Sequence, residues 1–150
     1  MKRFVWRLQK VLDIKVKEEQ VKQMELFRLT ETLAEKQSEL LVCQQTLREL
    51  LRKISQDRSP QRLGAQAFCL EYATTDDERI KALKQEIHDL NVRRQEKTAE
   101  VLTAKRFREG LEKLRDEAKE QFVREQERLE QKEMDDRTSV AFARAGSMES

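Results

Sequence analysis

The side chains that most often catalyse reactions or hold metal ions form no recognisable constellation in this 150-residue sequence. The single histidine, His88, lies between apolar residues of a predicted helix but is expected to face solvent. We therefore assign it to neither a catalytic triad nor a metal cluster. Cys43 and Cys69 lack metal-ligand spacing and are predicted to be reduced packing thiols. Neither Gly64 nor Gly110 begins a phosphate-binding loop. The sequence therefore predicts no enzyme activity, no metal and no cofactor.

The composition favours a thin hydrophobic seam over a thick core. Charged residues make up 40% of the chain and apolar residues 37%, whereas an ordinary globular domain has about 25% charged residues. Disorder is the competing interpretation, and the regular spacing of the apolar residues argues against it. Because 31 basic residues nearly balance 29 acidic ones, the net charge of +2 indicates no nucleic-acid partner.

The first 22 residues are locally basic, with seven basic and three acidic side chains. This run is either a solvated helix face or a docking surface for an anionic partner, including an anionic membrane surface. No stretch approaches the ~20 apolar residues of a membrane span, and no secretory signal is recognisable. We therefore expect a cytoplasmic protein without membrane insertion.

A heptad repeat predicts one long helix over residues 3–55. Glu19 interrupts the repeat. In most heptads a second seam residue follows three positions after the repeated leucine or isoleucine, which gives the 3-4 alternation of a coiled-coil seam. The residues that carry the repeat are Leu12, Leu26, Leu33, Leu40, Leu47 and Ile54.

Turn-forming residues between Gln56 and Gly64, including the only proline, Pro60, predict a short connection to a second helix. That helix is expected over residues 65–137 and antiparallel to the first, because a short connection reverses the chain. Long basic residues such as Lys97 occupy some of its seam positions. The predicted seam residues are Ile80, Leu83, Ile87, Leu90, Arg94, Lys97, Val101, Ala104, Arg108, Leu111, Arg115, Ala118, Phe122, Glu125 and Leu129.

The predicted fold is thus all-α: a long antiparallel coiled-coil hairpin with unequal arms, forming a single domain over residues 1–140. A capping-box pattern at Thr75–Glu78 indicates a kink or a new helix start, with an unbroken helix as the alternative. Carboxylates at 133, 135 and 136 oppose the dipole of the expected helix end, and residues 141–150 are expected to be a flexible tail.

Phe107, Leu114 and Val123 lie off the seam of the second arm and form a second apolar line. In an isolated hairpin this line would be exposed to water, so it indicates a partner surface.

Two motifs at the chain ends resemble those of the FliJ family of flagellar export proteins. The segment from Phe4 to Leu12 reads FVWRLQKVL and is similar to the F-x-[FW]-R-L-Q-x-[VL]-L opening of that family. The segments LEKLR (111–115) and EQKEMDD (130–136) look like its closing signature. Length, turn position and both motifs agree, so the resemblance covers nearly the whole chain.

The resemblance implies a stalk component of the flagellar type III export apparatus, at the cytoplasmic face of the bacterial inner membrane. Its implied partners are the hexameric export ATPase, the cytoplasmic domain of the export-gate membrane protein, and export chaperones. The implied ATPase contacts are Phe4, Trp6, Arg7, Leu8, Gln131, Lys132, Glu133, Met134, Asp135 and Asp136. Phe68 and Tyr72 match aromatic positions that the family uses toward the gate, although Asp76 and Arg79 are polar where the family can carry apolar residues.

Two other functions remain open from the sequence. One is the equivalent stalk of a non-flagellar type III secretion system, and the other is a generic self-associating coiled-coil scaffold. The hairpin itself is expected to be monomeric, because each arm supplies the other's seam.

Overall fold

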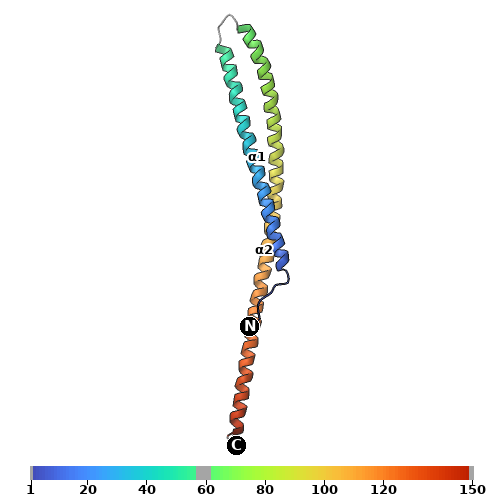
Figure 1. Ribbon diagram of the computed structural model, residues 1–150, viewed down its shortest axis with the longest axis vertical. Helices are drawn as coiled ribbons and strands as arrows, with labels where there is room; N and C mark the ends of the chain where they lie inside the picture. The colour runs from blue at the N-terminus through green and yellow to red at the C-terminus, as the bar shows by residue number, and fades with distance from the viewer. Residues whose placement is uncertain (1, 57–61, 149–150) are drawn as a thin grey trace. The chain divides into compact units, whose positions relative to one another are not determined.

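The computed structural model describes residues 2–56 and 62–148 and shows two helices, α1 (Gln9–Gln56) and α2 (Arg62–Met148) (Figure 1). The described residues contain no strand, and the two helices form an all-α hairpin, as predicted. Pro60, on which the predicted turn was centred, lies outside the described residues. Gly64 belongs to α2, so the second arm begins at Arg62 rather than at residue 65.

The chain divides into two compact units. The terminal unit comprises Met1–Glu18 and Ala104–Ser150, and the central unit comprises Glu19–Thr103. Each unit contains part of both helices. The prediction of a single domain over residues 1–140 stays a prediction.

The predicted seam residues are buried or half-buried in both units, except Arg115, Glu125 and Leu129 of α2, which are exposed. This follows from the 3-4 spacing, which places one narrow apolar stripe of each helix against the other. The layer is thin, as the composition indicated. Its buried hydrophobic members are Leu12, Leu33, Ile80, Leu83 and Leu111.

Ion pairs across the central unit record its antiparallel register. Glu25 on α1 contacts Lys97 on α2 at 2.7 Å. Lys36, eleven residues further along α1, contacts Glu86, eleven residues back along α2, at 3.4 Å. Equal steps on both arms of the hairpin mean that both segments keep the same rise per residue.

These ion pairs also change the proton affinities of their members. The hydrogen bond from Arg79 at 3.0 Å, followed by the charge of Lys36, lowers the pKa of Glu39. The hydrogen bonds to Glu25 and Glu100 raise the pKa of Lys97, whose aliphatic stem packs at a seam position while its ammonium group reaches the helix edge.

The heptad pattern predicted that the first arm begins at Arg3, and this prediction was wrong. Residues 2–6 are non-helical, a turn follows at residues 7–8, and α1 begins at Gln9. The amide of Gln9 donates a hydrogen bond to the carbonyl of Trp6 at 3.2 Å, which closes this turn.

The second arm is unbroken at Thr75 and longer than predicted. The Thr75 hydroxyl donates to the carbonyl of Glu71 at 3.1 Å, which is the bond of a threonine inside a helix rather than of a helix cap. α2 ends at Met148 instead of Arg137, and residues 141–148, the expected tail, are helical. The carboxylates at 133, 135 and 136 therefore lie within the helix and not at its end, so the expected opposition to the dipole of a helix end does not arise there.

We predict that Leu33→Ala destabilises the hairpin by about 2–4 kcal/mol, because Leu33 is only 3% exposed and its removal leaves a cavity in a seam one layer thick. Leu41→Ala, at a 58% exposed site on the same helix, is the matched control and should leave stability nearly unchanged. Thermal unfolding followed by circular dichroism measures both. Equal effects of the two variants would contradict the assignment of the seam.

We also predict that acid weakens the central unit through Glu39. Because its pKa is lowered in the folded state, its contribution to stability is present above the pKa of the unfolded chain and is lost as the pH falls through the lower, folded value. Glu39→Gln should therefore lower the melting temperature slightly at neutral pH and lessen its fall between about pH 5 and 3. Glu35→Gln, at an exposed site one turn earlier, serves as the control, and a change of the same size there would reject the role of Glu39.

Candidate partner-binding surface

The N-terminal residues 2–8, here called the strap, lie along α2 in the terminal unit (Figure 1). Phe4, Trp6 and Leu8 are half-buried, whereas Val5 is 81% exposed and Arg7 is also exposed. This period of two is the pattern of an extended chain with one side against a surface. Phe4 and Trp6 therefore belong to an extended segment and Arg7 and Leu8 to the turn that follows it, so none of these four predicted contact residues lies in a helix.

Two aromatic contacts join the N-terminal segment to α2 in the terminal unit. Their positions show how far along α2 the strap extends. The rings of Phe4 and Phe122 lie 5.4 Å apart between centroids, tilted by 54°. The ammonium group of Lys15 lies 5.1 Å from the centre of the Phe107 ring. These are geometries of favourable ring–ring and cation–ring contact.

The spacing of these contacts shows that the strap is stretched. Phe4 and Lys15 are eleven residues apart, but their partners Phe122 and Phe107 are fifteen residues apart on α2. An extended chain rises about 3.3 Å per residue against about 1.5 Å in a helix, so the strap covers more of α2 than a helix of the same length would.

The strap ends at a shallow groove beside the closing motif of α2. Lys2 lines this groove together with residues of α2. Six carboxylates and only two basic groups lie between residues 125 and 136, while the strap carries Lys2, Arg3 and Arg7. The α2 residues of the groove are Gln126, Leu129, Glu130, Lys132, Glu133 and Asp136.

Three of the six contact residues predicted near the end of α2 are thus placed beside the strap: Lys132, Glu133 and Asp136. The remaining three lie on exposed parts of the helix. Gln131 donates from its side-chain amide to Asp135 at 3.2 Å, and Met134 is exposed. The structure places Lys2, just before the opening motif, beside the closing motif, and the role of both motifs in partner binding stays a prediction.

Every described side chain of α2 from residue 127 to 147 is exposed. This stretch includes two apolar residues that were not predicted as surface features, Val140 and the 80% exposed Phe142. They were missed because the helix was expected to end at Arg137. The available signal was the absence of proline or glycine between Gly110 and Gly146.

The second apolar line of α2 is exposed, as predicted, at Phe107, Leu114 and Val123. The Lys15 ammonium group covers one face of Phe107, as described above. Leu114 and Val123 leave apolar surface open to a partner.

The aromatic pair Phe68 and Tyr72 belongs to the central unit. The two residues are four apart on α2 and both are exposed, so they lie on one face of the helix. Arg79, two turns further on, is engaged with Glu39. The face therefore carries two aromatic rings followed by a polar site that is committed to the hairpin.

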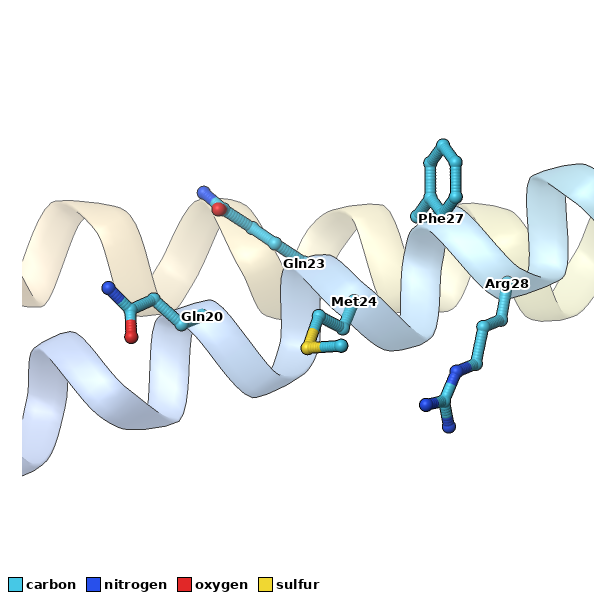
Figure 2. Close-up of a pocket in the computed structure, with 5 residues that line it drawn as sticks. All are labelled: Gln20, Gln23, Met24, Phe27 and Arg28. Atoms are coloured by element: carbon cyan, nitrogen blue, oxygen red, sulfur yellow. The ribbon is translucent and has the colours of Figure 1, made fainter.

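A further exposed patch lies on α1 of the central unit, where Gln20, Gln23, Met24, Phe27 and Arg28 line a hollow (Figure 2). All five residues come from one helix, and Phe27 and Arg28 point to different sides of it. The hollow therefore has no opposing wall. Met24 and Phe27 were not predicted as surface features, although both lie off the heptad seam.

The remaining candidate chemistry is sparse in the described residues. Cys43 and Cys69 are free and half-buried, in agreement with their interpretation as packing thiols. Residues 2–56 and 62–148 contain no cluster of three or more His, Cys, Asp or Glu side chains suited to a metal ion. In the same part of the chain, no helix combines the length and apolarity that crossing a membrane requires.

Two antiparallel helices with open, charged and aromatic faces define a coiled-coil hairpin protein. A family model described as "Flagellar FliJ protein" matches residues 3–147, so the chain belongs to the FliJ family. Membership implies a component of the flagellar type III export apparatus. Searches of curated proteins and of solved structures gave no significant match.

We predict a coupling free energy of about 0.5–1.5 kcal/mol between Phe4 and Phe122, because their rings are in contact. A double-mutant cycle of Phe4→Ala and Phe122→Ala, followed by urea unfolding, measures it. The control cycle replaces Val5, whose side chain faces solvent, in place of Phe4. Additive effects in the Phe4 cycle would mean that the two rings do not meet in solution.

Proposed function

We propose that this protein is a non-enzymatic stalk of the flagellar export apparatus that binds the export ATPase hexamer through the terminal unit and raises its rate of hydrolysis. The observation that carries the proposal is the groove in which Lys2, just before the opening motif, meets Glu133 and Asp136 of the closing motif. Sequence motifs far apart in the chain gain a common role when they form one surface.

The exposed end of α2 supports the same proposal. A helix that enters a ring must remain folded without a partner along its whole length, and local ion pairs provide that support. Arg124 bonds Glu120 at 2.6 Å and Arg128 bonds Glu125 at 2.7 Å. The mixed charges at this surface are suited to reversible contacts, since exposed ion pairs are individually weak.

A second contact, toward the cytoplasmic domain of the export gate, is proposed at Phe68 and Tyr72. Their exposure on one face of α2 provides an apolar anchor for a partner. Because Arg79 is paired with Glu39, we expect the gate contact to depend on the two rings and not on Arg79. Export chaperones are further proposed partners, and the protein would act at the cytoplasmic face of the inner membrane.

The match to a flagellar family favours this assignment over a stalk of a non-flagellar secretion system. A generic self-associating scaffold differs in a measurable property. Sedimentation over a range of concentrations should show a monomeric hairpin if the seam is satisfied within one chain, and concentration-dependent dimers if it is a scaffold.

We predict that truncation after Arg128 abolishes most of the stimulation of the export ATPase, because it removes residues 131–136 from the proposed contact surface. Truncation after Asp136 is the matched control, since it removes the last part of α2 and keeps those residues. ATP hydrolysis by the purified ATPase, with and without each variant, measures the effect. Unimpaired stimulation by the shorter variant would refute the placement of the contact at residues 131–136, and loss with both would move it to residues 137–148.

A further inference from the structure

The strap has a sequence that fits two different packings. Counting back from the buried Leu12 by the spacing of the seam, Leu8 and Val5 fall on seam positions. A helical strap would therefore bury Val5 and Leu8. The extended strap instead half-buries Phe4, Trp6 and Leu8, with Phe4 against Phe122 of α2, and leaves Val5 in water.

The two packings reach different distances along α2. In a helical strap, each step along the chain would match one step along α2, so that Phe4, eleven residues before Lys15, would lie near Ala118 instead of Phe122. Lys2 would then end near residue 120. Phe122 would be uncovered, and Lys2 would leave the groove at residues 126–136.

The two packings also use different forces, so neither is excluded by local chemistry. The extended form brings two aromatic rings together and sets Lys2 in a groove lined by carboxylates of α2. The helical form completes backbone hydrogen bonds over residues 3–8 and adds Val5 to the seam. The turn at Trp6–Gln9 is the point at which one form converts to the other.

We propose that the strap is a conformational switch that covers Phe122 when extended, and uncovers it when it joins α1 as a helix. The switch is built from the terminal unit alone and does not depend on the proposed function. In the extended form, the strap lies on a surface of α2 in its own chain. A partner of α2 would have to reach that same surface.

Arg7→Pro tests the switch by blocking one form only. Arg7 is the second residue of the turn that ends at Gln9, where proline is favoured, and the preceding Trp6 is non-helical. In a helix that starts at residue 3, proline at position 7 would break the backbone hydrogen bonds. Phe4→Ala acts in the opposite direction because it removes the ring that anchors the extended form.

Nuclear magnetic resonance of the full-length chain distinguishes the two forms, with the Cα chemical shifts of residues 3 and 5 as the measure of helix and ring contacts to Phe122 as the measure of the strap. We expect Phe4→Ala to raise the helical population about five- to tenfold over the unmodified chain. Phe4→Ala combined with Arg7→Pro should remove that increase. Arg7→Pro alone should retain the contact between Phe4 and Phe122.

Added salt provides a second measurement, since about 0.5 M salt reduces the Debye length to a few ångströms and weakens the attraction between strap and α2. The helical population of the unmodified chain should rise with salt, and that of Arg7→Pro should not. Identical Cα chemical shifts in Phe4→Ala and in the double variant would overturn the proposal, because the released strap would then be disordered and not helical. Loss of the Phe4–Phe122 contact in Arg7→Pro would overturn it as well, because the turn would not be built as described.

Discussion

The structure depends on one constraint: each helix has a single apolar stripe, and that stripe must be covered by the other helix. With 40% charged residues there is no material for a second layer, so no part of the fold is stabilised by depth of burial. Cross-helix ion pairs such as Lys97–Glu25 lie beside the seam. Glu19 is 5% exposed at a heptad position, where it accepts a hydrogen bond from Gln23 at 3.3 Å. A polar residue at such a position lowers the stability of the seam and disfavours other registers.

The apolar stripe of one helix is covered only where the other helix is present. The unequal lengths of α1 and α2 therefore leave one end of α2 without a covering helix. α1 has 48 residues and α2 has 87. In the terminal unit the strap extends the cover by stretching, and from residue 127 onward the described side chains of α2 are all exposed. Apolar residues in that stretch, Phe142 among them, gain burial only from a partner.

The seam was predictable from sequence because the heptad period is a strong and redundant signal: one misplaced residue, such as Glu19, does not change the phase. The start of α1 was not. Val5 and Leu8 continue the heptad and would suit a helix. The burial of Phe4 and Trp6 favours an extended chain instead. That burial is a tertiary effect, which no local sequence pattern contains. Thr75 failed as a capping signal for a related reason. Its hydroxyl donates a hydrogen bond to a carbonyl one turn earlier in α2. The helix continues through this residue because α2 is packed on both sides of it.

That the N-terminal segment lies along α2 follows from the hairpin topology, but the position of Lys2 at an acidic groove of α2 became visible only with the register of the strap. Lys2 of the strap lies at a stretch of α2 with an excess of carboxylates. Any partner that binds this stretch of α2 through basic groups competes with the strap, whereas a partner that binds the strap through acidic groups competes with α2. The affinity of either partner is then reduced by the fraction of molecules in which the two segments are paired within the chain. The same intramolecular contact that completes the terminal unit thus sets a threshold for its association with other proteins.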